Sequence, residues 1–217
     1  MAICNVSEAR QRILDQAHAL PGRRCGLSQA SGCVLAADIV APLNLPHWDN
    51  SAMDGYAVRA ADVGSAGENN PIHLRVTGEI AAGTAATVSL EPQACVRIFT
   101  GAPIPDGADA VVMQEDTRPH HEGYVAILEA VDPGENIRRA GDDVRVGDIV
   151  LRAGTQLGPA QVALLAALGI GEIDVHPRPR VGVLVTGAEL VEPGRKLQAG
   201  QIYDSNSFAI AGWLRDA

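Results

Sequence analysis

The feature that most constrains the fold of this chain is its central part, residues 72–130, which breaks into short β-type runs separated by Gly, Pro and Asp turns. The runs are 73–77, 87–90, 95–99, 110–114 and 124–129. Short runs rich in β-branched residues and bounded by turn residues are typical of strands. We therefore expect an all-β insert here.

Helical patterns lie on both sides of this insert. Apolar residues recur at helical spacing over 6–20, and Asn5 and Glu8 are placed like the two members of a capping box. A second helix is predicted over 159–168, with Gly169 as its C-terminal stop. The chain thus mixes helices with an all-β part.

Three further segments complete the predicted elements. We expect a strand at 33–40 and a hairpin-like stretch at 148–152. The run 181–185 is apolar throughout, as suits the interior of a parallel sheet, and Asp204 opens a helical pattern. This last part resembles the first βα unit of a parallel sheet. Because one strand and one helix are marginal alone, we expect the sequence to be a fragment of a longer protein.

Charge and composition exclude several classes of protein. The formal net charge of −9 argues against a nucleic-acid partner. The single lysine, Lys196, leaves no GK[ST] phosphate loop and little basis for Schiff-base chemistry. The four cysteines form no CxxC pair, and the histidines show no zinc spacing. The longest apolar run, 158–170, is too short to span a bilayer, so we predict a cytoplasmic protein with reduced thiols and no membrane partner.

Carboxylates and hydroxyls crowd into loops that follow the predicted strands. The loop 46–57 holds Asp49 and Asp54, and the loop after 95–99 begins with Thr100. Two interpretations stay open for these loops. In the first, the loops are structural: their polar side chains hydrogen-bond the backbone of their own turns, or the loop is a rigid connection between strands. In the second, a stiff loop presents these polar groups to a ligand.

A third loop region lies at the expected edge of the parallel sheet, where open α/β sheets bind ligands. Thr186 and Gly187 follow the apolar run, and Asp204 and Ser205 begin the helix. A helix start favours anions, whereas Asp204 would repel a phosphate unless a divalent cation lay between them. Ordinary N-capping by Asp204 is the alternative, and both interpretations hold if Ser205 or Ser207 contacts the ligand.

Nine consecutive residues, 49–57, read Asp-Asn-Ser-Ala-Met-Asp-Gly-Tyr-Ala. They are followed in order by the blocks 97–105, 110–115, 136–143 and 201–206. In this order the segments resemble the molybdopterin molybdenumtransferase family, whose members include MoeA and the E domain of gephyrin. The chain departs from the family pattern at Val185, where Ser is usual, and at Ala188, where Asp is frequent.

The resemblance implies an enzyme of molybdenum-cofactor biosynthesis. It would insert molybdate into adenylylated molybdopterin and release AMP with the help of Mg²⁺, as an elongated homodimer. A molybdopterin adenylyltransferase would be the upstream enzyme. The family's downstream glycine-rich loop and final β-domain would lie beyond residue 217, so the fragment alone is expected to be inactive.

The resemblance also assigns residues by motif. The catalytic candidates are Asp54, Thr100, Asp143 and Glu189, with Glu189 also the metal ligand. The substrate-binding candidates are Thr186, Gly187, Asp204, Ser205 and Asn206.

The expected fold is therefore α+β with several subdomains, mixed and all-β, followed by the truncated start of an α/β, molybdopterin-binding domain. Residues 1–20 would be a helix that packs on that later domain. Residues 21–45 with 144–174 would form a linker subdomain, 46–143 the β-rich insert, and 175–217 the α/β start.

Two other functions compete with the enzymatic one. A noncatalytic dimeric scaffold or binding module could use the same fold, as gephyrin does. A generic magnesium-dependent phosphohydrolase would need only clustered carboxylates, and the nine-residue motif argues against it. Retention of the four catalytic candidates favours the enzyme.

Overall fold

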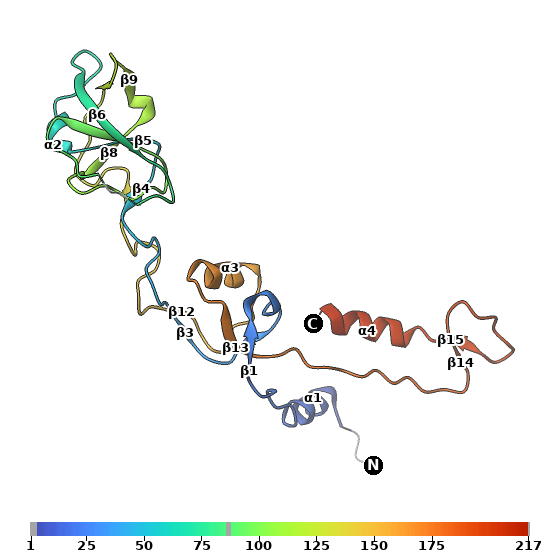
Figure 1. The fold of residues 1–217 in the computed structure, drawn as a ribbon. Coiled ribbons are helices and arrows are strands. Elements are labelled where there is room, and N and C mark those ends of the chain that lie inside the picture. Colours follow the sequence, from blue (N-terminus) through green and yellow to red (C-terminus); the bar gives the residue numbers. More distant parts are fainter. Residues whose placement is uncertain (1–3, 86–87, 217) are drawn as a thin grey trace. The chain divides into compact units, whose positions relative to one another are not determined.

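The computed structural model describes residues 4–85 and 88–216 (Figure 1). The chain separates into two compact units, one formed by residues 24–175 and the other by the segments before 24 and after 175. Within the described ranges, no helix has the length and apolar character to cross a membrane. The α+β, multi-subdomain fold class is confirmed, whereas the finer four-part division stays a prediction.

A curled six-stranded sheet dominates the larger unit. Its strands are β5 (Gly55–Val58), β6 (Ile72–Ile80), β7 (Ala94–Ile98), β8 (Ala110–Met113), β9 (Thr117–Pro119) and β10 (Tyr124–Ile127). They lie in the order β8-β5-β7-β6-β10-β9, and only β6 and β7 are parallel (Figure 1). The predicted all-β insert is confirmed, with a single-turn helix, α2 (Ala60–Val63), after β5.

Both faces of this sheet pack against buried apolar clusters, which explains why its strands are strongly apolar. Along β7, Cys95 belongs to one buried cluster, whereas Val96 and Ile98 belong to another. Alternate residues of a strand point to opposite faces, so each run contributes to two cores. The strand predicted at 87–90 is wrong for 88–90, where Leu90 bonds instead to the loop carbonyl of Asp106 (2.7 Å), and residue 87 lies outside the described residues.

A second core in the same unit combines a small sheet with helices. The sheet has the order β1 (Arg23–Gly26), β13 (Glu172–His176), β2 (Val34–Leu35). Helix α3 (Pro159–Ala167) packs there beside the single-turn η1 (Leu27–Gln29). Leu35, Leu157 and Leu165 are fully or almost fully buried in this core.

Two of the predicted β segments pair in unexpected ways. The expected strand 33–40 is interrupted, because β2 and β3 (Ile39–Val40) belong to different sheets. The hairpin predicted at 148–152 is wrong, since β12 (Ile149–Leu151) pairs with β3. Likewise β11 (Ile137–Arg138) pairs with β4 (Asn50–Ser51), so these connections are long-range.

The smaller unit contains helix α1 (Val6–Leu14) with the predicted capping box. The Glu8 N–H donates to Asn5 Oδ1 at 2.9 Å, and the Asn5 N–H donates to the Glu8 carboxylate at 3.3 Å. The expectation that this helix continues to residue 20 is wrong. Ile13 and Leu14 are 70% and 51% exposed, and short helices depend on tertiary packing to extend.

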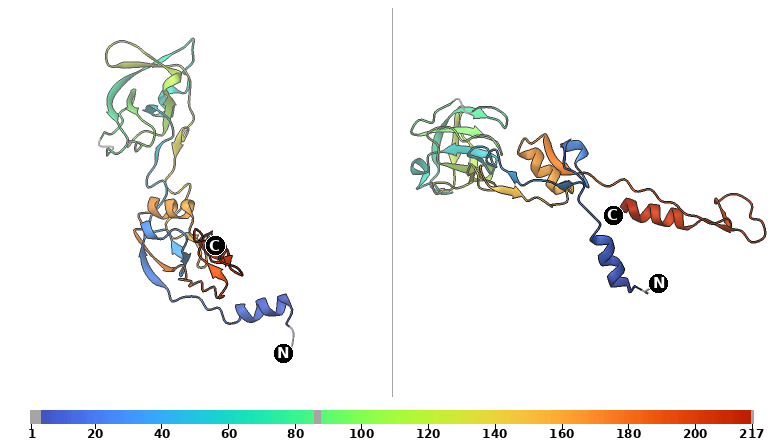
Figure 2. Two further views of the ribbon diagram at one scale, coloured as in Figure 1. Left: turned by 90° about the vertical axis from the view of Figure 1, so that its right-hand side faces the viewer. Right: turned by 90° about the horizontal axis from the view of Figure 1, so that it is seen from below.

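The rest of the smaller unit holds β14 (Leu190–Val191) and β15 (Ile202–Tyr203), a short parallel pair, and helix α4 (Asn206–Asp216). The helix after Asp204 is confirmed. The strand expected at 181–185 is wrong, and Figures 1 and 2 show this segment as extended chain without an arrow. An apolar run becomes a strand only by pairing with a neighbour, and among the described residues none pairs with it.

Candidate functional site

Asp54 and Thr100 are brought together by the pairing of β5 with β7. Asp54 immediately precedes β5 and Thr100 follows β7, and these antiparallel strands place Gly55 opposite Ile98. The backbone N–H and the hydroxyl of Thr100 both donate to Asp54 Oδ1, each at 2.8 Å. We call these two residues the Asp54–Thr100 pair.

The contacts of the pair fix its charge state. The pKa of Asp54 is lowered, mainly by the backbone N–H of Thr100, then by its hydroxyl, with a smaller effect of the Arg97 charge. Asp54 is therefore ionised at neutral pH and is unsuited to act as a general acid there. The Thr100 hydroxyl donates its hydrogen bond to Asp54, and its oxygen keeps lone pairs that can accept another one.

Other members of the 49–57 motif build the loop. Asp49 accepts from the Ala140 N–H at 2.8 Å and from the Arg139 guanidinium at 2.6 Å, and these bonds, the first most of all, lower its pKa. Asn50 and Ser51 are buried and bond locally, to the carbonyls of Trp48 and Met53. The turn interpretation thus holds for Asn50 and Ser51, while Asp49 ties the loop to a distant segment.

Gly55 is required by a close approach of strands. A Cβ placed there would lie 1.9 Å from the carbonyl oxygen of Val112 on β8. Any side chain at this position would push β5 away from β8. Gly55 thereby sets the position of its neighbour, Asp54.

Asp143 lies in a different part of the larger unit from β5 and β7. Its backbone N–H donates to the Leu45 carbonyl at 2.9 Å, and its side chain is exposed. Among the described residues, its carboxylate makes no hydrogen bond with either member of the Asp54–Thr100 pair. The neighbouring Asp142 accepts from the Arg139 N–H at 2.7 Å, so the two acids of this block have different surroundings.

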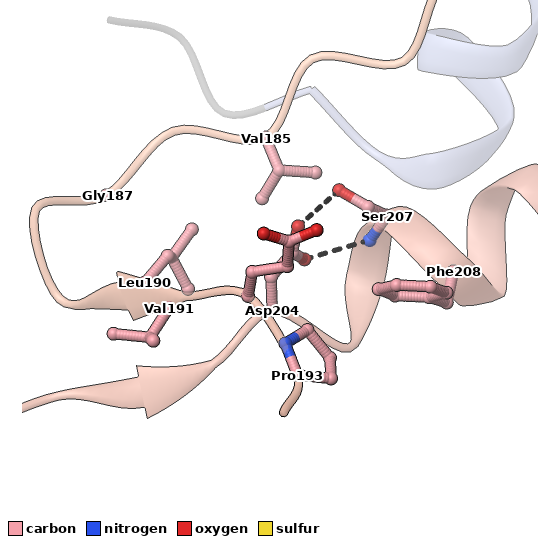
Figure 3. A pocket seen from close by; sticks show the side chains of 9 residues that line it. Val185, Gly187, Leu190, Val191, Pro193, Asp204, Ser207 and Phe208 are labelled. Atoms are coloured by element: carbon pink, nitrogen blue, oxygen red, sulfur yellow. Dashed lines mark hydrogen bonds between the residues drawn. The ribbon is translucent and has the colours of Figure 1, made fainter. Parts of the chain in front are cut away.

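Two candidates of the smaller unit, Gly187 and Asp204, line a pocket of about 420 Å³ (Figure 3). Asp204 Oδ1 accepts from the Ser207 N–H at 3.0 Å, and Oδ2 accepts from the Ser207 hydroxyl. The Ser207 hydroxyl and then its N–H lower the pKa of Asp204. The Asp204 side chain thus binds a first-turn N–H of α4, as the N-capping interpretation expects, although Asp204 lies two residues before the first helical residue, Asn206.

Of the remaining predicted residues, some line this pocket and others lie outside its wall. Gly187 lines it, whereas Thr186, Ser205 and Asn206 are exposed and do not. Glu189 also lies outside the lining, and its carboxylate oxygen is 2.6 Å from where a Gly187 Cβ would be. The rest of the wall is Val185, Leu190, Val191, Glu192, Pro193, Asp204, Ser207 and Phe208.

Comparison with known proteins decides the family. The sequence model of the "MoeA N-terminal region (domain I and II)" matches residues 4–169. The chain belongs to the MoeA family. The molybdopterin molybdenumtransferase 2 of Mycobacterium tuberculosis is 51% identical over 88% of this chain and 47% of its own length. The molybdopterin molybdenumtransferase of Haemophilus influenzae is 44% identical over 94% of this chain and 50% of its own length.

A solved structure supports the same assignment. The molybdopterin biosynthesis moeA protein of Pyrococcus horikoshii OT3 superposes with a TM-score of 0.84 and 39% identity, over 96% of this chain and 56% of that one. The chain thus spans about half the length of the relatives it matches. The matched MoeA region contains Asp54, Thr100 and Asp143, whereas Glu189 and Asp204 follow it.

Sequence reasoning missed two residues of these sites. Arg97 contributes its charge to the lowered pKa of Asp54, and Phe208 lines the pocket. Ser207, named from the sequence as a possible ligand contact, binds both oxygens of Asp204 instead. Arg97 stands within one of the MoeA-like sequence blocks, which could have marked it. No local pattern distinguishes Phe208 from other apolar helix residues.

Proposed function

We propose that the protein to which this chain belongs is a molybdenum insertase, which inserts molybdate into adenylylated molybdopterin and releases AMP. The names of its relatives support a role in molybdenum-cofactor biosynthesis. The observation that carries the proposal is the Asp54–Thr100 pair, an exposed carboxylate and hydroxyl oriented by two hydrogen bonds. Such a preorganised pair is suited to orienting a polar substrate.

The two members of the pair would have different tasks. Asp54 stays charged and accepts hydrogen bonds, so it would hold a donor group of the substrate or balance a positive charge. Thr100 would present its oxygen lone pairs in a fixed direction, because the hydrogen bond from its hydroxyl to Asp54 fixes the orientation of the O–H group. Asp143, exposed and without these bonds, is proposed to contribute a second carboxylate.

The pocket beside Asp204 is proposed to take the phosphate end of the substrate. Mg²⁺ usually binds through one or two carboxylates and completes its shell with water and substrate phosphates. Within residues 4–85 and 88–216, no cluster of three His, Cys, Asp or Glu could hold a metal by itself. Glu189 is exposed and could be one of these carboxylate ligands. A bound Mg²⁺ would offset the repulsion between the Asp204 carboxylate and the substrate phosphate. Thr186, Gly187, Ser205 and Asn206 stay proposed substrate contacts.

We also propose that the whole protein is a homodimer and receives its substrate from a molybdopterin adenylyltransferase. Exposed apolar residues support the dimer, since Val6 of α1 and Trp213 of α4 are 86% and 73% exposed. Light scattering should give a dimer mass for the full-length protein. A monomer at all accessible concentrations would refute this part.

The activity is tested by molybdate-dependent AMP release from adenylylated molybdopterin, using the full-length protein. Asp54→Asn keeps the shape but loses the charge, and we expect a rate at least about 100-fold lower, the scale of a lost catalytic side chain. Thr100→Val should lose the hydroxyl contact and retain the backbone one. Glu129→Gln, which changes another exposed carboxylate on the same unit, is the matched control.

Two results would overturn these assignments. Absence of AMP release by the wild-type protein would refute the proposed activity. A wild-type rate in Asp54→Asn would refute the role of the pair. The melting temperature of Asp54→Asn should stay close to that of Glu129→Gln, because both are surface changes.

A further inference from the structure

The larger unit has a pocket of its own, of about 380 Å³. Its wall is formed by Trp48, Gly83, Thr84, Ala85 and Pro103. The volume lies within the range of roughly 300–1,000 Å³ that is usual for small-molecule sites, whose walls are mostly apolar and aromatic with a few polar groups. We call this cavity the Trp48 pocket.

The Trp48 pocket and the Asp54–Thr100 pair are built on the same two loops. Backbone hydrogen bonds of 2.8–3.0 Å join segment 49–51 to segment 101–104 in an antiparallel ladder. The pair lies just beyond one end of this ladder, and Trp48 lies directly beyond the other. A ligand bound in the pocket would therefore lie close to the pair.

The third side of the pocket comes from the loop 81–85, which follows β6. Strands β6 and β7 are parallel, with Ile80 opposite Ile98, so the chain leaves both strands at the same edge of the sheet. The Phe99 N–H donates to the Ile80 carbonyl at 3.3 Å, which extends this pairing to the point where the two loops begin. Strand pairing thus fixes where the walls of the pocket meet.

The Trp48 indole is oriented by its neighbours but is not covered by them. The ring of His47 meets it edge-on, at a centroid distance of 5.5 Å and an interplanar angle of 66°, and His47 Nδ1 is 2.7 Å from the Asn44 carbonyl oxygen. The Asn50 side chain donates to the Trp48 carbonyl at 3.1 Å. Trp48 nevertheless remains 49% exposed. A fixed and half-exposed indole is suited to pack against a second aromatic ring.

Thr84 adds a polar group to this apolar wall. Its hydroxyl donates to the Ala81 carbonyl at 2.6 Å, so its oxygen can accept a hydrogen bond from a ligand. The Trp48 pocket therefore combines an aromatic face with a hydrogen-bond acceptor. A planar heteroaromatic ring that carries an amino group matches both.

We propose that the Trp48 pocket binds the pterin ring of the substrate, with that ring packed against the Trp48 indole. The inference deepens the proposed function and rests on it, because adenylylated molybdopterin carries two planar rings that bear an amino group, a pterin and an adenine. The adenine is attached at the phosphate end, which is proposed to bind beside Asp204. The pterin adjoins the dithiolene that takes up molybdate, so it is the ring expected next to the Asp54–Thr100 pair.

The direct test is an NMR titration of the full 217-residue chain with 6-hydroxymethylpterin, followed at the indole N–H signals. The chain has two tryptophans, and Trp213 lies on α4 in the other unit. We expect a saturable shift of the Trp48 signal and none of the Trp213 signal, which serves as the internal control. A parallel titration with AMP should leave Trp48 unchanged. An unmoved Trp48 signal with the pterin, or an equal or stronger response to AMP, would overturn the proposal.

Variants of the wall locate the binding in the pocket. Ala85→Leu keeps the Trp48 reporter and fills the cavity, so the saturable shift should be lost. Ala82→Leu is the matched control, because Ala82 is an exposed residue of the same loop that does not line the pocket. Trp48→Ala carries the test by calorimetry if Ala85→Leu does not fold, and it should weaken binding of the pterin at least about 10-fold. Wild-type affinity in Trp48→Ala would refute the packing on the indole.

A kinetic measurement separates this inference from the proposed function. In the full-length protein Trp48→Ala should raise KM for adenylylated molybdopterin with kcat little changed, because the ring packing is the same in the ground state and the transition state. Trp48→Phe, which keeps an aromatic face, should restore most of the affinity. An unchanged KM in Trp48→Ala would contradict the inference and leave the proposed function intact. If the wild type releases no AMP, the proposed function fails, while the pterin titration still decides what the pocket binds.

Discussion

Replacing Gly55 with alanine tests the close contact that positions Asp54. The alanine Cβ would lie 1.9 Å from the Val112 carbonyl oxygen, whereas real Cβ atoms essentially never approach other atoms closer than 3.0 Å. The strands must therefore separate by about 1 Å at this point. The obstacle is backbone within a ladder, so no flexible side chain can move aside.

The expected cost follows from two contributions. Overpacking in a well-packed region costs about 1–3 kcal/mol, and a weakened ladder hydrogen bond adds about 1 kcal/mol. We expect Gly55→Ala to lower the free energy of unfolding by about 3 kcal/mol, or the melting temperature by about 12 °C. Urea denaturation followed by circular dichroism measures the loss directly.

Gly67→Ala is the matched control for this measurement. Gly67 lies in the same unit, has no left-handed φ, and has open space within 4 Å of the place where a Cβ would lie. Its substitution should change stability by less than about 0.5 kcal/mol. A loss in Gly55→Ala below about 1 kcal/mol, or an equal loss in Gly67→Ala, would refute the packing argument.

Three further predictions concern other parts of the chain. Alkylation followed by mass spectrometry should modify Cys4 first and Cys95 last, because burial raises the pKa of Cys95 to about 12; early labelling of Cys95 would contradict its burial. The pKa of Asp49 is lowered by its bonds to Ala140 and Arg139, so its contribution to stability is present above the unfolded value of about 3.9 and is lost as pH falls through the lower folded value. Asp49→Asn should therefore flatten the acid limb of the stability curve, and an unchanged limb would argue against this bond. Hydrogen exchange should be fast over 181–185 and slow over β7, since strand pairing protects only the latter, and slow exchange over 181–185 would show an unrecognised pairing.

Much of the local structure was determined by the sequence. The capping box of α1 and the end of α3 before Gly169 follow from neighbouring residues alone, and turn residues marked the positions of β6, β7, β8 and β10. Turn residues and caps act within a few positions, so their effects can be recognised without the rest of the fold. The 49–57 motif likewise indicated the family.

Only the tertiary structure decided which polar residues meet. Asp54 and Thr100 are 46 positions apart, and Asp49 and Arg139 are 90 apart. The same nine-residue motif thus contains one carboxylate that ties the loop down and another in the candidate site, and local spacing does not distinguish them. Tertiary structure also decided which apolar runs are strands, because a strand exists only when the backbone of a partner segment hydrogen-bonds to it. That is why β12 pairs with β3 rather than forming a local hairpin, and why the apolar run 181–185, for which the described chain provides no partner, is not a strand.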